Sequence, residues 1–180
     1  IKGMQAKGIS ATIKHFAGNE SEIKRTTNSS EIDERSLREI YLVPFEMAVK
    51  EAGTWAIMSS YNKINGTYAA ENHWLLTQVL RVEWGYDGII MSDWFGSRTT
   101  APTLNAGLNL EMPGPARDRG DKLVDAVQAG VVSAQTVRSL ALDMLRLIQR
   151  TGSLDDHRSH NEMAEDRPEH RALIRRAGAE

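Results

Sequence analysis

Residues capable of chemistry stand directly after short apolar runs of this sequence. Together they offer a cation, an imidazole, hydroxyl groups, carboxylates and an indole: Lys14, His15, Ser60, Tyr61, Asp93, Trp94 and Glu111. If the runs are strands of a parallel sheet, these side chains meet at the carboxyl ends of the strands, where such folds bind their ligands. A carboxylate beside an indole suits a sugar, because a sugar ring stacks on an aromatic face while its hydroxyl groups need charged or polar partners.

The apolar runs that would position these residues alternate with helical patterns along the chain. They occupy residues 10–16, 55–60, 88–92 and 107–111. Short, nearly continuous apolar strands separated by helices are typical of a parallel sheet covered by helices. A closed (β/α)8 barrel needs about 250 residues, so four such units predict an α/β fold that is a partial TIM-type barrel.

Several residue types mark where the intervening helices begin and end. Apolar residues over 37–52 keep a helical spacing, and Pro44 among them predicts two helical pieces, with Pro44 near the start of the second. Asn72 and Ser133 are N-cap residue types in front of two further helices with an apolar face. Another helix is expected over residues 118–129.

The composition changes after Gly152. Residues 153–167 are polar and acidic without apolar periodicity, which indicates a linker, and Pro168 then opens a short basic helix. We expect residues 1–152 to form the second half of a barrel, about its last four units, and residues 168–180 to begin a second α/β domain. The chain would then be an interior piece that lacks the first half of the barrel.

The balance of charge excludes several partners. Lys and Arg number 22 and Asp and Glu 24, for a net charge of −2, and no block of like charge predicts binding to a nucleic acid or to a membrane. The absence of cysteine excludes disulfides and thiolate chemistry. No phosphate loop, dinucleotide fingerprint or metal motif occurs, so no cofactor and no metal are expected. The compartment stays open between cytoplasmic and periplasmic or secreted.

The ordered motifs resemble those of glycoside hydrolase family 3, in particular its β-glucosidases. KHFAGNE at residues 14–20 resembles the KHF motif of that family, and SDW at residues 92–94 resembles its nucleophile motif. LREIYL at residues 37–42, MSSYN at residues 58–62 and GLNLEMPG at residues 107–114 match its other signatures in the same order. Each motif alone is weak, but five in order are specific.

The resemblance implies a role for each of seven residues. Asp93 would be the nucleophile that attacks the anomeric carbon and forms a glycosyl-enzyme intermediate. The other six would bind the substrate, a β-glucoside or short oligosaccharide: Lys14, His15 and Arg25 through sugar hydroxyls, Tyr61 beside the nucleophile, Trp94 as an apolar wall and Met58 by a less specific contact. The cations Lys14 and Arg25 would help to keep Asp93 ionised.

Retaining hydrolysis also needs a second carboxyl group about 5 to 5.5 Å from the nucleophile. In the family this glutamate comes from a second α/β domain that follows the barrel, so we expect it outside this chain. Residues 17–19 read AGN where the hexosaminidase branch has a Pro-Gly-His loop, which argues against that branch. The implied activity is that of a retaining, exo-acting β-glucosidase that removes terminal non-reducing glucose.

Other interpretations stay open at this point. Without the resemblance, Asp93 could cap a helix, His15 could be a structural histidine and Met58 could belong to the core. Within the family, a β-xylosidase or α-L-arabinofuranosidase shares much of this region. Because the acid/base is expected elsewhere, the chain could also be a non-catalytic sugar-binding fragment, and an aldolase with Lys14 as a Schiff base is a further alternative.

Overall fold

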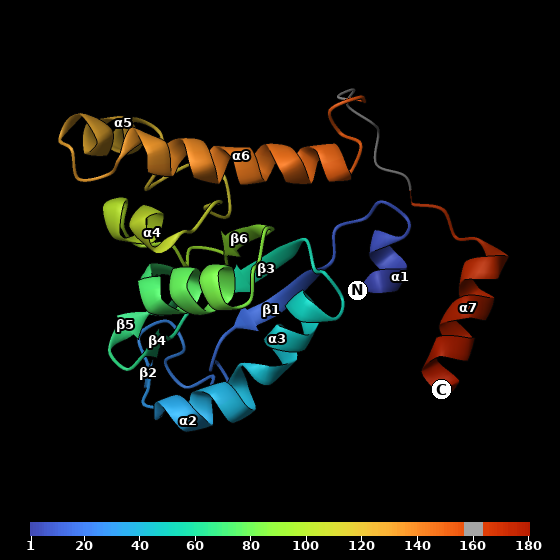
Figure 1. The fold of residues 1–180 in the computed structure, drawn as a ribbon. Helices are drawn as coiled ribbons and strands as arrows, with labels where there is room; N and C mark the ends of the chain where they lie inside the picture. Colours follow the sequence, from blue (N-terminus) through green and yellow to red (C-terminus); the bar gives the residue numbers. More distant parts are fainter. Residues whose placement is uncertain (157–163) are drawn as a thin grey trace.

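The computed structural model describes residues 1–156 and 164–180. Its centre is a parallel sheet of three strands in the order β1-β3-β6, formed by Thr12–Phe16, Ala56–Ser59 and Ile89–Ser92 (Figure 1). Each strand lies within one of the predicted apolar runs. The prediction of an α/β fold with parallel strands is therefore confirmed.

The fourth predicted strand does not form. Leu110 makes a single parallel bridge with Met91, and residues 107–111 contain no other strand pairing among the described residues. The reason is the side chain of Asn109, whose Oδ1 accepts the Ile90 N–H at 2.8 Å in place of a backbone carbonyl. The Ser92 N–H donates to the Leu110 carbonyl and the Leu110 N–H to the Ile90 carbonyl, so the fourth run joins β6 at one position without forming an extended strand.

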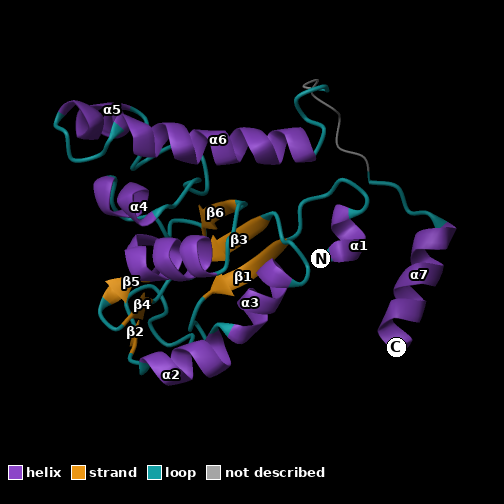
Figure 2. Ribbon diagram, in the orientation of Figure 1, coloured by secondary structure: helices purple, strands orange, loops and turns teal. Residues whose placement is uncertain are grey.

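Helices pack around the sheet, some of them beside β1 and others beyond β6 (Figure 2). Those that follow the strands are α2 (Glu34–Ser36), the π-helical η1 (Leu37–Tyr41), α3 (Val43–Lys50), the π-helical η3 (Trp74–Glu83), α4 (Ala101–Ala106), α5 (Asp121–Gln128) and α6 (Ala134–Arg150). Pro44 lies in the first turn of α3, as predicted from its fixed φ. Asn72 Oδ1 accepts the Leu75 N–H, and the Ser133 hydroxyl accepts the Thr136 N–H, so both predicted caps are confirmed.

A second, small sheet is present that the sequence analysis missed. It consists of β2 (Ser29–Ser30), β4 (Lys63–Ile64) and β5 (Thr67–Tyr68). Asn65 and Gly66 join β4 to β5 with φ angles of 49° and 87°, a two-residue turn that the Asn-Gly sequence favours. The flanking strands have two residues each, too few to show the alternation of apolar and polar residues by which a strand is predicted.

The remaining elements lie at the ends of the chain and before η3. They are α1 (Lys2–Gln5), the 3-10 helix η2 (Ala69–Glu71) and α7 (Pro168–Ala179). The helix predicted after Pro168 is confirmed, and none of its residues is buried. Residues 157–163, which belong to the predicted linker, lie outside the described part.

The main core fills the space between the parallel sheet and the helices after β1 and β3. Its largest fully buried side chains include Phe16, Leu37, Ile57, Leu75, Leu76, Leu80, Ile90 and Leu108. A second cluster joins α4, α5 and α6 through Leu104, Ala126, Val132 and Leu140. This packing buries every residue of β3 and β6 except Met58 and Met91, whereas in β1 it fully buries only Phe16.

Phe16 provides a direct test of this core. Its side chain is fully buried, and its ring meets that of Phe45 edge-on at 4.9 Å between centroids. We expect Phe16→Ala to lower the free energy of unfolding by about 3–5 kcal/mol, because the cavity adds to the lost transfer free energy. Urea unfolding of the purified protein measures this, with the exposed Ile23→Ala as control. A loss no larger than that of the control would contradict the assigned core.

Candidate active site

The three parallel strands end in register, and this alignment brings the predicted residues together. Phe16 pairs with Ser59, and Ser59 pairs with Ser92. His15 precedes the first of these positions, Tyr61 follows the second by two residues, and Asp93 follows the third directly. The site therefore lies at the carboxyl ends of the strands, as predicted.

An irregularity in β1 turns two neighbouring side chains toward one cavity. Adjacent residues of a regular strand point to opposite faces of the sheet. The register of β1 against β3 shifts between Ile13 and Phe16, and Lys14 and His15 occupy the shifted stretch. Both residues line a cavity of about 490 Å³, together with Asn19, Glu20, Ile40, Tyr41, Pro44 and Phe45. Such bulges commonly re-aim side chains beside active sites.

Neighbouring groups orient the Asp93 carboxylate at the carboxyl end of β6. Its Oδ2 lies 3.1 Å from His15 Nε2, and its Oδ1 accepts the Trp94 backbone N–H at 2.7 Å. The side chain is 16% exposed, which leaves it reachable from solvent. Hydrogen bonds to an ionised oxygen are among the stronger ones in proteins, so this carboxylate has a defined orientation.

The His15 imidazole is the neutral partner in this pair. Partial burial lowers the pKa of His15 below its usual 6.5, against the opposing effect of the Asp93 charge. Lys14 also lowers that pKa through its positive charge. At neutral pH the Nε2–H of His15 therefore donates to Asp93 without placing a full positive charge beside it.

Tyr61 and Arg25 form the opposite side of the site. The Tyr61 hydroxyl donates to the Trp94 carbonyl at 2.8 Å, and the Arg25 guanidinium lies 5.1 Å from the centre of the Tyr61 ring. Burial, followed by the charge of Asp93, raises the pKa of Tyr61, so its hydroxyl stays protonated. Arg25 also pairs with Glu22 at 2.8 Å, a partner that the sequence analysis missed although three-residue spacing of opposite charges was visible.

The last two predicted residues lie nearby but differ in surroundings. Trp94 follows Asp93 directly, and its indole side chain is exposed, with 59% of the residue surface accessible. Met58 lies on β3, paired with Met91 of β6, and is only partly buried. The structure thus brings Lys14, His15 and Arg25 to the same end of the sheet as Tyr61, Trp94 and Asp93, with Met58 one position earlier on the middle strand.

The lowered pKa of His15 has a consequence for stability. Below pH 6.5 the unfolded chain binds a proton at His15 that the folded chain resists, so folding stability falls as the pH falls from about 6.5 through the lower folded pKa. We expect His15→Gln to remove this part of the pH dependence. Thermal unfolding at about pH 7.5 and about pH 5 measures it, with His73→Gln, an exposed imidazole, as control. An unchanged pH dependence in His15→Gln would contradict the assignment.

Other ligand classes find little support in the described part of the chain. Over residues 1–156 and 164–180 no group of three or more His, Asp or Glu side chains is placed to hold a metal ion. No helix in the same residues is both long and apolar enough to cross a bilayer. The groups that the site offers are the Asp93 carboxylate, the His15 imidazole and nearby cations, with Lys14 and His15 also lining a partly open cavity.

Comparison with curated proteins gives relatives along the whole chain. A beta-glucosidase of Rhizobium radiobacter is 63% identical over 180 residues, covering 100% of this chain and 22% of that protein. Beta-glucosidase B of Emericella nidulans is 48% identical over 181 residues, covering 100% of this chain and 21% of that protein. The chain therefore spans about a fifth of the length of these relatives.

Solved structures share the fold. The structure of beta-glucosidase 3B from Thermotoga neapolitana in complex with alpha-D-glucose has a TM-score of 0.91 at 37% identity, covering 99% of this chain and 26% of that one. A GH3 beta-glucosidase from Bifidobacterium adolescentis has a TM-score of 0.87 at 43% identity, covering 97% of this chain and 25% of that one. A model of the family described as "Glycosyl hydrolase family 3 N terminal domain" matches residues 1–147. Since that match spans most of its 180 residues, the chain belongs to the N-terminal domain of glycosyl hydrolase family 3.

Proposed function

We propose that the protein carrying this chain is a retaining, exo-acting β-glucosidase whose nucleophile is Asp93. The observation that carries this proposal is the Asp93 carboxylate at a strand end, oriented by His15 at 3.1 Å and by the Trp94 N–H at 2.7 Å. The relatives are themselves named beta-glucosidases, which agrees with this activity, and one of the solved structures is a complex with alpha-D-glucose.

In the proposed reaction an Asp93 oxygen attacks the anomeric carbon while the bond to the leaving oxygen breaks. This forms a covalent glycosyl-enzyme intermediate with inverted configuration, and attack by water on it restores the original one. Departure of the aglycone needs a proton from a second carboxylic acid. We propose that this acid lies outside the present chain, so the 180 residues supply the nucleophile and the sugar contacts only.

The neighbouring residues would bind the glucosyl ring. We propose that Lys14, His15 and Arg25 donate hydrogen bonds to its hydroxyl groups, since all three carry N–H donors at the same rim. Trp94 would stack against the apolar face of the sugar, and Met58 would contact it less specifically. Tyr61, protonated and fixed on the Trp94 carbonyl, would hold the segment next to the nucleophile.

The domain organisation that goes with this function is also proposed. Residues 1–152 would form the second half of a (β/α)8 barrel, and residues 168–180 would open the domain that brings the acid/base. Residues 153–167 would link the two, with 157–163 outside the described part. The open cavity beside His15 and the exposed apolar residues of α3 and α6 agree with further chain packing against this piece.

The stereochemistry of the product tests the retaining mechanism. Proton NMR of the full-length protein acting on an aryl β-glucoside should show the β-anomer of glucose before it mutarotates to the α-anomer. First appearance of the α-anomer would contradict the proposal. Faster turnover of the aryl β-xyloside or α-L-arabinofuranoside would agree with the Asp93 mechanism but assign a different sugar specificity. No turnover of any of these substrates would favour a sugar-binding role.

A further inference from the structure

The turn that follows the candidate nucleophile is strained. The Gly96 N–H donates to the Asp93 carbonyl at 2.9 Å, which closes a four-residue turn through Trp94 and Phe95. Phe95 has a φ of 62°, in the left-handed region that residues with a side chain rarely adopt. Residues in such conformations persist only where their surroundings hold them, and they gather at functional sites.

The chain segment around Glu111 supplies the surroundings that hold this turn. The Phe95 N–H donates to the Met112 carbonyl at 2.9 Å, and the Met112 N–H donates to the Ser92 hydroxyl at 2.9 Å. The Ser92 N–H donates to the Leu110 carbonyl, also at 2.9 Å. Hydrogen bonds to the segment from Leu110 to Met112 therefore hold the chain on both sides of Asp93.

The Arg117 side chain packs against the same turn. Its guanidinium carbon lies 4.7 Å from the centre of the Phe95 ring, and its Nη2 donates to the Ser97 carbonyl at 3.2 Å. Its Nε lies 3.6 Å from Glu111 Oε1. One side chain thus contacts the strained residue, the residue after the turn and a buried carboxylate.

Glu111 fixes Arg117 in this position. The Glu111 side chain is only 3% exposed, and its carboxylate accepts the backbone N–H groups of Arg117 and Asp118 at 3.1 to 3.3 Å. A buried carboxylate is unfavourable unless it is paired and hydrogen-bonded. The bonds it makes here order the backbone from which the Arg117 side chain projects.

We propose that Arg117, held by Glu111, is a positioning residue that aims the Asp93 carboxylate by fixing the turn from Asp93 to Gly96. This inference rests on the proposed function, because it assigns Arg117 a part in the same reaction. The guanidinium covers the Phe95 ring and binds the Ser97 carbonyl, so the turn cannot relax without breaking both contacts. Arg117 acts through the turn rather than on the sugar.

The expected signature is a loss in the rate of attack with little change in substrate binding. A misplacement of about 1 Å at a reacting group can lower the rate by about 10²-fold. We therefore expect Arg117→Ala to lower kcat by about 10- to 100-fold at an unchanged KM. Arg117→Lys should lose nearly as much, because an ammonium group keeps the charge but neither stacks on Phe95 in the same way nor presents a planar fork.

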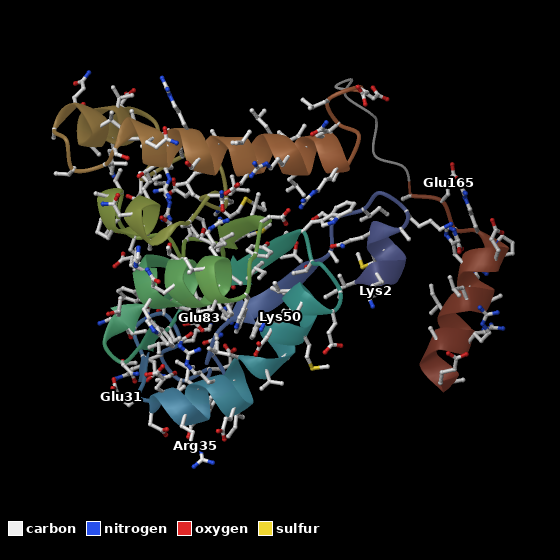
Figure 3. All side chains as sticks on the ribbon, in the orientation of Figure 1. Lys2, Glu31, Arg35, Lys50, Glu83 and Glu165 are labelled. Carbon is white, nitrogen blue, oxygen red and sulfur yellow. The ribbon has the colours of Figure 1, made fainter. Side chains whose placement is uncertain are left out.

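The experiment measures the rate at which a 2-deoxy-2-fluoro-β-glucosyl reagent labels the full-length protein. The variants are Arg117→Ala, Arg117→Lys, Glu111→Gln and the double variant Glu111→Gln with Arg117→Lys. The control is Arg35→Ala, whose side chain is 82% exposed, pairs with Glu39 one helical turn away and points away from the body of the molecule (Figure 3). Thermal unfolding of each variant records whether it is folded.

Three results would support the proposal: slower labelling by the folded Arg117→Lys variant at unchanged affinity for the reagent, wild-type labelling by Arg35→Ala, and a double variant no slower than the worse single one. If Arg117→Ala fails to fold, the labelling rate of Arg117→Lys tests the positioning role. Wild-type labelling by folded Arg117→Lys and Glu111→Gln would overturn the positioning role, whatever their stability. Absence of label on wild-type Asp93 would instead overturn the proposed function.

Discussion

Asp93→Gly is expected to lower kcat/KM for an aryl β-glucoside by about 10⁴-fold or more, the scale on which removal of a nucleophilic or paired catalytic group acts. The carboxylate is held by His15 and by the Trp94 N–H, so its position is set by the backbone and a neighbour that both remain in the variant. The fold should therefore survive while the covalent step is lost. Steady-state kinetics of the purified variant, with its unfolding midpoint, measure both.

The same variant offers a second readout through a small anion. Glycine leaves room for azide at the place of the carboxylate, and azide attack on a β-glucoside would give the α-glucosyl azide with recovery of part of the rate. Asp87→Asn is the matched control, because that carboxylate is exposed and pairs with Arg150 on the surface. Activity close to wild type in Asp93→Gly, or rescue that yields a β-glucosyl azide, would contradict Asp93 as the nucleophile.

Lys14→Met is expected to lower kcat/KM by about 10- to 100-fold. A hydrogen bond to a charged group contributes about 1.5–3 kcal/mol, and the shifted stretch of β1 turns the Lys14 ammonium into the same cavity as His15. Methionine preserves most of the length and apolar stem of lysine and removes only the charged donor. The loss should therefore come from the sugar contact and leave the unfolding midpoint nearly unchanged.

A set of deoxy substrates identifies the contact that Lys14 makes. If Lys14 binds one hydroxyl group of glucose, the variant and the wild type should differ least on the β-glucoside that lacks this hydroxyl. Lys7→Met, a change at an exposed lysine of the loop before β1, should act like wild type on every substrate. An equal loss on all deoxy substrates would show that Lys14 acts by stabilising the local structure or by its electrostatic effect on the site, and not by binding one hydroxyl group. Borohydride trapping at Lys14 with a carbonyl substrate would favour the aldolase alternative.

The sequence predicted the elements whose signals are local. The apolar runs around Ile57 and Ile90 became strands, and the cap residues Asn72 and Ser133 became helix starts. The run at residues 107–111 failed as a strand because the Asn109 side chain, rather than its backbone, satisfies the Ile90 N–H. That competition depends on the distance between two segments nearly twenty residues apart, which no local pattern contains.

For the site, the sequence predicted which residues lie at the carboxyl ends of the strands, but not how their side chains are oriented toward each other. His15 and Asp93 were each placed at a strand end, yet their contact at 3.1 Å depends on the register shift in β1. The contact between Arg117 and Phe95 was not predicted, because the positive φ of Phe95 and the stacking of Arg117 exist only in three dimensions. Family membership is established by the match over residues 1–147, whereas the roles of the individual residues stay predictions.

Covalent trapping of the glycosyl-enzyme tests directly whether Asp93 is the nucleophile. The full-length protein is incubated with a 2-deoxy-2-fluoro-β-glucosyl reagent, whose fluorine destabilises the oxocarbenium-like transition states and slows breakdown of the glycosyl-enzyme, and is then digested for peptide mapping. We expect one added fluoroglucosyl group, on the peptide that contains Asp93 and on that residue. A label on another carboxylate of a folded, active protein would contradict the assignment of Asp93 as the nucleophile.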